Sequence, residues 1–149
     1  MRDQGADIEP AAARRIVVET RGYPNFLQEW GKHSWDAADD SPFTVEDVQA
    51  ASITAVAALD ASFFRVRFDR LTPSEKQYLR AMAERGPGPH RSGDIAQELG
   101  RAVTTLAPLR NQLIPKGMIW GPAHGDTAFT VPLFDEFMKR MMPGDEWRG

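Results

Sequence analysis

Residues 71–82 read Leu-Thr-Pro-Ser-Glu-Lys-Gln-Tyr-Leu-Arg-Ala-Met and contain the clearest helix start in the chain. Thr72 can cap the helix with its hydroxyl, Pro73 suits the first helical position, and Glu75 lies where a capping-box acid reaches back to the cap. The apolar side chains that follow recur at helical spacing, at Tyr78, Leu79 and Met82. We therefore predict a helix that begins at Pro73 and is stopped by residues 86–89, Gly-Pro-Gly-Pro.

Two further helical patterns follow this stop. Ser92 can cap a helix over residues 93–99, and Gly100 can supply the turn after it. Another helix is predicted to begin near residues 104–105, with Pro108 in its first turn, where a missing N–H costs little. The expected apolar faces consist of Ile95, Ala96 and Leu99 in the first helix and of Leu109, Leu113 and Ile114 in the second.

The pattern then changes from helix to strand. Residues 118–120 and 129–131 are rich in strand formers and flank the polar, glycine-containing residues 121–128, which predicts a β-hairpin with a long loop. Helical spacing returns over residues 133–142. The order helix, short helix, helix, hairpin is the layout of a winged helix-turn-helix domain, in which the third helix can enter a major groove of DNA.

Upstream of residue 71 the sequence predicts a purely helical region. One helix is expected from Pro10 to Gly22, and a second begins at Pro24 and ends before the polar residues 39–42. Thr44, with the acids that follow it, is the predicted cap of a third helix. The apolar face of this third helix is expected to comprise Val48, Ala51, Ala55, Leu59, Phe63 and Val66.

These elements give a mainly α fold with two parts. We expect a disordered N-terminus over residues 1–7, a three-helix subdomain over 8–69, a winged helix-turn-helix domain over 70–143 and a flexible tail over 144–149. The chain has 149 residues and a net charge of −3, but residues 1–69 carry 7 basic and 12 acidic side chains and residues 70–149 carry 11 and 9. The net charge is thus an average of an acidic and a slightly basic part.

Composition excludes several classes of protein. There are no cysteines, which excludes disulfides, thiolate metal sites and a cysteine nucleophile. No apolar run approaches the roughly 20 residues that span a bilayer, so we expect a cytoplasmic protein without membrane partners. The excess of two basic side chains in the second part is small, because proteins that coat DNA normally carry far more.

Residues 21–32, Arg-Gly-Tyr-Pro-Asn-Phe-Leu-Gln-Glu-Trp-Gly-Lys, resemble the helical lid of bacterial and archaeal AAA-type ATPases of the STAND and initiator-like groups, which carry a Gly-x-Pro signature. Residues 71–75, 91–96, 113–119 and 129–134 resemble the winged-helix domain that follows this lid. The resemblance covers roughly residues 8–142. It implies the C-terminal region of an ATP-binding protein, in which the lid moves with the nucleotide and the winged helix moves with the lid.

The resemblance further implies that Gly22, Tyr23 and Pro24 lie beside the adenine of a bound nucleotide, whose ATP and Mg²⁺ a P-loop domain would hold. This chain has no G-x-x-x-x-G-K-[ST] motif and no Walker B acid, so we expect it to be no enzyme and to bind no cofactor alone. A structural explanation of the same turn also stands: glycine ends one helix, proline begins the next, and the tyrosine packs between them.

Polar side chains suited to DNA gather on and around the predicted third helix. Arginine, asparagine and glutamine can contact base edges in pairs of hydrogen bonds, whereas threonine, serine, lysine and histidine suit phosphates. The candidate DNA-binding residues are Arg91, Ser92, Thr104, Thr105, Arg110, Asn111, Gln112, Lys116 and His124. Asp94 and Glu98 on the preceding helix oppose this interpretation.

Three functional hypotheses therefore remain open from the sequence. The first is a non-catalytic C-terminal region of an AAA/STAND-like ATPase that binds double-stranded DNA or a protein partner, with a P-loop domain elsewhere. The second is a free-standing winged-helix transcription regulator, and the third is a protein-interaction module that does not bind DNA. The three histidines lack metal-ligand spacing and no paired catalytic acid and base is visible, so we expect neither a metal site nor catalytic residues.

Overall fold

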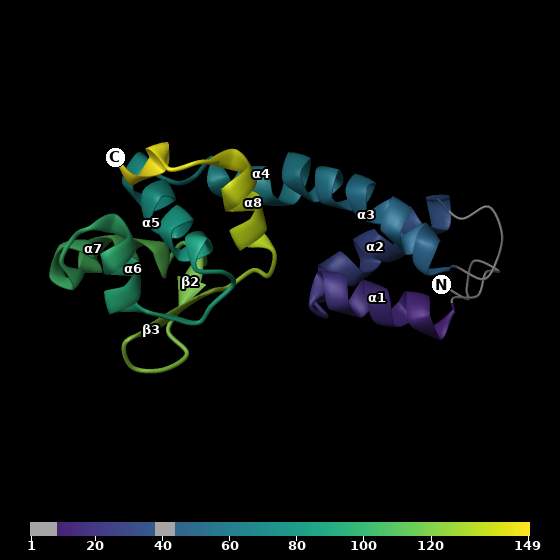
Figure 1. Ribbon diagram of the computed structural model, residues 1–149, viewed down its shortest axis with the longest axis horizontal. Coiled ribbons are helices and arrows are strands. Elements are labelled where there is room, and N and C mark those ends of the chain that lie inside the picture. The colour runs from purple at the N-terminus through teal and green to yellow at the C-terminus, as the bar shows by residue number, and fades with distance from the viewer. Residues whose placement is uncertain (1–8, 38–43) are drawn as a thin grey trace. The chain divides into compact units, whose positions relative to one another are not determined.

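The computed structural model of the chain describes residues 9–37 and 44–149. Within these ranges the fold is mainly α-helical, with a small three-stranded antiparallel sheet, which confirms the predicted class (Figure 1). The chain divides into two units, Met1–Phe63 and Phe64–Gly149. The predicted disordered segment 1–7 and the predicted loop 39–42 lie outside the described residues. None of the helices in the described ranges is long and apolar enough to cross a bilayer.

Unit 1 contains the helices α1 (Pro10–Thr20), α2 (Pro24–Ala37) and α3 (Val45–Leu59), as the sequence predicts. The α3 start is a capping box, in which the Thr44 hydroxyl accepts from the Asp47 N–H at 3.2 Å and the Asp47 carboxylate accepts from the Thr44 N–H at 3.0 Å. Buried aliphatic and aromatic side chains form the core of unit 1. This core contains Ala12, Ile16, Phe26, Trp30, Val48, Ala51, Ala55 and Leu59.

A polar cluster joins the three helices of unit 1. The Trp30 indole N–H donates to the Glu19 carboxylate at 2.8 Å and lies 3.2 Å from the Ser52 hydroxyl, which itself donates to Glu19. Burial acts to raise the pKa of Glu19, but the hydrogen bonds from Ser52, Arg15 and Trp30 outweigh it, so the pKa is lowered. Glu19 is therefore held ionised where α1, α2 and α3 meet.

A π-helical turn, Asp60–Phe64, connects α3 to the short helix α4 (Arg65–Phe68). The sequence predicts that the apolar face of α3 continues to Val66, but that side chain is 50% exposed, and Phe64 and Phe68 are buried instead. The π-turn explains this difference, because its wider i to i+5 spacing shifts the buried positions along the chain. Phe63 remains in unit 1, where its ring centroid lies 5.4 Å from that of Phe26.

Unit 2 alternates helices and short strands. The strands form one antiparallel sheet in the order β1-β3-β2, in which His90 pairs with Thr127 and Ile119 pairs with Phe129. The elements after α4 are α5 (Pro73–Glu84), β1 (His90–Arg91), α6 (Ser92–Leu99), α7 (Val103–Leu113), β2 (Ile119–Trp120), β3 (Asp126–Phe129), α8 (Phe134–Met141) and a 3-10 turn (Glu146–Arg148).

The helix start at Thr72 is confirmed. The Thr72 hydroxyl accepts from the Glu75 N–H at 3.2 Å, and the Glu75 carboxylate accepts from the Thr72 N–H at 2.8 Å. The predicted inward face of α5, Tyr78, Leu79 and Met82, is buried. On α6 the predicted stripe of Ile95, Ala96 and Leu99 is buried as well, and Gly100 ends the helix with a φ of +63°.

Several local predictions in unit 2 are wrong. Ser92 is the first residue of α6, not its cap; Arg91 is at the cap position and makes no side-chain capping bond. Pro108 lies inside α7, beyond its first turn, because the helix already begins at Val103. The last strand begins at Asp126 instead of residue 129, since it pairs with β1 as well as β2. Strand β1 was not predicted, because a strand of two residues is too short to show the alternation of apolar and polar side chains.

The buried face of α7 also differs from the prediction. Leu113 is buried as expected, but Ile114 is 38% exposed, and Leu106 is buried at 3% exposure. Leu106 and Leu113 lie two helical turns apart on the same face, whereas Ile114 follows the last residue of α7. The exposed positions of α7 therefore differ from those that the sequence predicts.

The core of unit 2 has an aromatic part and an aliphatic part. Phe137 is fully buried, and its ring centroid lies 5.3 Å from Phe64, 5.6 Å from Phe68 and 5.3 Å from Phe134. This cluster joins α4 to α8. The aliphatic part consists of Leu79, Met82, Ile95, Leu113 and Ile119, all fully or almost fully buried.

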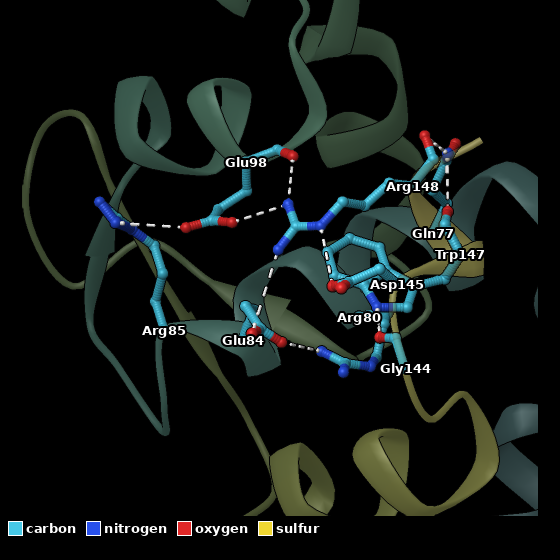
Figure 2. Close-up of polar contacts among 9 residues, drawn as sticks. All are labelled: Gln77, Arg80, Glu84, Arg85, Glu98, Gly144, Asp145, Trp147 and Arg148. Atoms are coloured by element: carbon cyan, nitrogen blue, oxygen red, sulfur yellow. Dashed lines mark hydrogen bonds and ion pairs between the residues drawn. The ribbon is translucent and has the colours of Figure 1, made fainter.

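The C-terminal segment 143–149 is fastened to α5 and α6, which differs from the flexible tail that its sequence suggests. Figure 2 shows Trp147 between two arginines, with the Arg80 guanidinium 4.6 Å and the Arg148 guanidinium 4.3 Å from its ring. Arg148 pairs with Glu98 at 2.9 Å, and the Gln77 amide donates to the carbonyls of Trp147 and Arg148. The hydrogen bonds reach residues 50 to 71 positions away in the chain, which local sequence patterns do not reveal.

Replacing Gln77 with alanine should loosen this segment without affecting the core. Because two hydrogen bonds to backbone carbonyls are lost, we expect the free energy of unfolding to fall by about 1 kcal/mol. The amides of residues 147–149 should also exchange with solvent faster. Hydrogen exchange followed by NMR checks this, with Gln97→Ala on the exposed side of α6 as the matched control. Unchanged exchange in the Gln77 variant would show that the amide does not hold the segment.

Candidate functional site

The exposed surface of α7 is the candidate site, because most of the predicted DNA-binding residues lie on or next to this helix. Thr104 and Thr105 are exposed in its first turn, and Asn111 and Gln112 are exposed near its end. Ala102 at the N-cap makes no side-chain capping bond, and the Thr105 N–H donates to the Ala102 carbonyl at 3.0 Å, so the N–H groups of Val103 and Thr104 remain for a solvent-borne acceptor. The structure thus brings these four polar side chains to one element.

Arg110 is directed into unit 2. Its Nε donates to the Thr127 hydroxyl at 2.9 Å, and Nη2 donates to the carbonyl of Asp126 at 3.1 Å. Gly121 leaves room for this arrangement, since a Cβ there would lie 2.7 Å from Nη2. Two of the three guanidinium nitrogens are therefore committed to strand β3, and Arg110 is a weaker candidate for reading bases than the sequence suggests.

Lys116 is also committed to the fold. Its ammonium donates to the buried Glu75 carboxylate at 2.6 Å and to the carbonyl of Arg70 at 3.1 Å. Burial acts to raise the pKa of Glu75, but hydrogen bonds from Lys116 and Thr72 together with the lysine charge outweigh it, so the pKa is lowered. Lys116 thus joins the end of α7 to the start of α5.

The remaining candidates flank α7 in the chain. Arg91 is exposed on β1, Ser92 is half-buried at the start of α6, and His124 is exposed in the β2–β3 loop. Arg101, exposed in the turn between α6 and α7, is a further cation that sequence reasoning missed. Neither Arg91 nor Arg101 forms an ion pair with the residues that the structure describes. A basic residue directly before a predicted helix was the available signal for Arg101.

The acids of α6 are partly neutralised by arginines. Glu98 lies 2.9 Å from Arg148 and 3.6 Å from Arg85 (Figure 2). Asp94 lies 3.9 Å from Arg85. No acidic residue occurs in α7 itself. The two acids therefore repel an anion near α7 less than their presence in the sequence suggests.

The predicted nucleotide-contacting turn lies in unit 1. Gly22 has a φ of +74° and follows the end of α1, and α2 begins at Pro24. The half-buried Tyr23 ring stacks on Phe26 with 4.7 Å between centroids and meets Phe63 edge-on at 6.4 Å. The tyrosine ring thus packs against two aromatic rings of unit 1, which agrees with the structural explanation of this turn.

The chain is a mainly helical protein with a small antiparallel sheet, and α7 exposes Thr104, Thr105, Asn111 and Gln112. Its particular family follows from comparison: residues 61–138, just over half of the chain, match the family described as a domain of unknown function, DUF8462. The chain belongs to this family. No curated protein and no solved structure is significantly similar to it. The matched residues span most of unit 2 and end within α8.

Proposed function

We propose that unit 2 is a winged helix-turn-helix that binds duplex DNA through the exposed surface of α7. The observation that supports this most is the element order α5-β1-α6-α7-β2-β3 combined with the sheet order β1-β3-β2. This is the arrangement of winged helices, in which the third helix enters the major groove. In unit 2 that helix is α7.

The exposed side chains of α7 have suitable chemistry. Asn111 and Gln112 can each form two hydrogen bonds with an adenine edge, and the threonine hydroxyls of the first turn can donate to phosphates. The open N–H groups after Ala102 add the partial positive charge of a helix N-terminus. The helix itself has no acidic side chain that would repel the DNA backbone.

The number of available cations predicts weak, strongly salt-dependent binding. Arg110 and Lys116 are committed within unit 2, so the phosphate contacts fall to Arg91, Arg101 and, at the β2–β3 loop, His124. Two neutralised phosphates give a slope of about −2 for the logarithm of affinity against the logarithm of salt concentration. We therefore propose that α7 makes a weak DNA contact, which other domains of a larger assembly would reinforce.

Unit 1 would be the lid-like subdomain of an AAA/STAND-like ATPase, and the DNA contact would respond to nucleotide bound by a P-loop domain. Two observations support this part of the proposal. Val17, Val18 and Ile53 of unit 1 are 51%, 71% and 77% exposed, as expected of apolar side chains that another domain covers. Gly22 leaves the backbone of the turn accessible. Without the P-loop domain, the chain would neither bind nor hydrolyse ATP.

Fluorescence polarisation with a labelled duplex of random sequence tests the DNA proposal on the full chain. We expect binding at about 50 mM salt that weakens about tenfold at 200 mM, as two phosphate contacts require. Binding that is independent of salt would contradict the proposed contacts. Absence of binding at 50 mM would overturn the DNA proposal in favour of a protein-interaction module.

A further inference from the structure

A small pocket that opens to the surface lies between α5, α6 and α7. Its volume is about 180 Å³, and it is lined by Tyr78, Ser92, Val103, Leu106, Ala107 and Arg110. A cavity of about 150 Å³ is large enough to hold benzene in a protein interior. The pocket therefore accommodates a single six-membered ring or a branched aliphatic group of similar size.

The lining has an apolar and a polar side. Val103, Leu106 and Ala107 of α7 provide aliphatic walls, whereas Tyr78, Ser92 and Arg110 contribute a phenol, a hydroxyl and a guanidinium. Apolar walls with a few convergent polar groups are typical of small-molecule sites. A ligand with one apolar and one polar end matches this division.

The positive charge of the Arg110 guanidinium indicates that the polar end of the ligand is negatively charged. Nε and Nη2 are held by Thr127 and by the carbonyl of Asp126, and neither acceptor is a carboxylate. Within the described residues Arg110 forms no ion pair, and no hydrogen bond from Nη1 is present. Its charge is thus fixed in place by neutral acceptors and not compensated, which leaves it available to a small anion that enters the pocket.

Tyr78 is neutral, which is compatible with a negatively charged ligand. Burial raises the pKa of the Tyr78 phenol, against the lowering effects of the Thr127 hydrogen bond and the Arg110 charge. The phenol therefore remains protonated at neutral pH and adds no negative charge that would compete for Arg110. The Ser92 hydroxyl, half-buried at the start of α6, can donate a second hydrogen bond.

We infer that this pocket binds a small monocarboxylate with an aromatic or branched aliphatic body. The carboxylate lies against Arg110 and Ser92, and the apolar body lies against Val103, Leu106 and Ala107. Because four of these residues, all except Ser92, belong to α7, an occupied pocket fixes the position of the helix that we propose to face DNA. The binding site itself does not depend on that proposed function.

Benzoate is the probe for this inference, and benzyl alcohol is its uncharged control. We expect the full chain to bind benzoate with a dissociation constant of about 1 mM, and benzyl alcohol at least about tenfold more weakly. Titration followed by NMR should show nuclear Overhauser effects from the benzoate ring protons to the methyl groups of Val103 and Leu106. Absence of binding up to about 20 mM, or equal binding of the two probes, would overturn the inference.

Two variants locate the probe. Ala107→Leu fills the pocket without touching the Arg110 bonds and should weaken benzoate binding at least about tenfold. Gly121→Ala displaces the guanidinium, since the added Cβ would meet Nη2, and should weaken benzoate but not benzyl alcohol. Circular dichroism confirms that both variants are folded. Unchanged benzoate affinity in folded Ala107→Leu would place the probe elsewhere and contradict the inferred site.

Discussion

Replacing Phe137 with alanine should lower the free energy of unfolding by about 3–5 kcal/mol, the largest effect that we expect from a single substitution. Phe137 is fully buried, and it is the ring that contacts Phe64, Phe68 and Phe134 together. Alanine removes apolar surface from the core and leaves a cavity that the surrounding helices fill only in part. Urea denaturation followed by circular dichroism measures the loss.

The matched control is Val66→Ala in the neighbouring helix α4. Its side chain is 50% exposed, so the substitution should change the unfolding free energy by less than about 0.5 kcal/mol. This pair of variants also tests the π-turn, since the uninterrupted helix that the sequence predicts would bury Val66. Equal losses in the two variants would contradict the position of α4 in the structure.

Replacing Lys116 with methionine should destabilise the protein by about 2 kcal/mol, because the Glu75 carboxylate loses the cation that pairs with it. The Glu75 side chain is fully buried, but it lies close to the surface. The Lys116 side chain that covers it is 37% exposed, so water can reach the site when this cation is removed. We therefore expect less than the full cost of an isolated buried charge. Adding Glu75→Gln to Lys116→Met should restore part of the loss, because the amide oxygen can still accept from Thr72.

The same pair gives a pH dependence of known sign. The folded-state pKa of Glu75 is lowered from its ordinary value of 4.5, so its contribution is present above that pH and is lost as pH falls. The unfolding free energies of the native chain and of Lys116→Met should thus converge as the pH is lowered below 4.5. Denaturation at several pH values checks this. A constant difference would show that Lys116 does not act through Glu75.

Sequence signals predicted those features that depend on neighbours in the chain. The capping boxes at Thr44 and Thr72, the inward face of α5 and the turn at Gly100 all follow from residues within a few positions of each other. Features that depend on distant partners were not predicted. Strand β1 exists because β3 pairs with it, and Trp147 is buried because Arg80 and Gln77 hold its segment.

The candidate site shows the same division. Exposure of Thr104, Thr105, Asn111 and Gln112 follows from the pattern of α7, so the sequence identified them. Residue type alone cannot show which way a long cationic side chain turns. Arg110 and Lys116 suit DNA by their chemistry, yet their acceptors, on β3 and on α5, come from parts of the chain that only the fold brings near.

Introducing a negative charge on α7 tests most directly whether this helix binds DNA. The affinity of the full chain for a short duplex should be measured by polarisation at about 50 mM salt for Thr105→Glu and Gln112→Glu. Gln28→Glu, at an exposed position of α2, is the matched control. Each α7 variant should weaken binding at least about tenfold, because a carboxylate next to the phosphates repels them. Gln28→Glu should bind as the native chain does. Native affinity in both α7 variants would contradict the account.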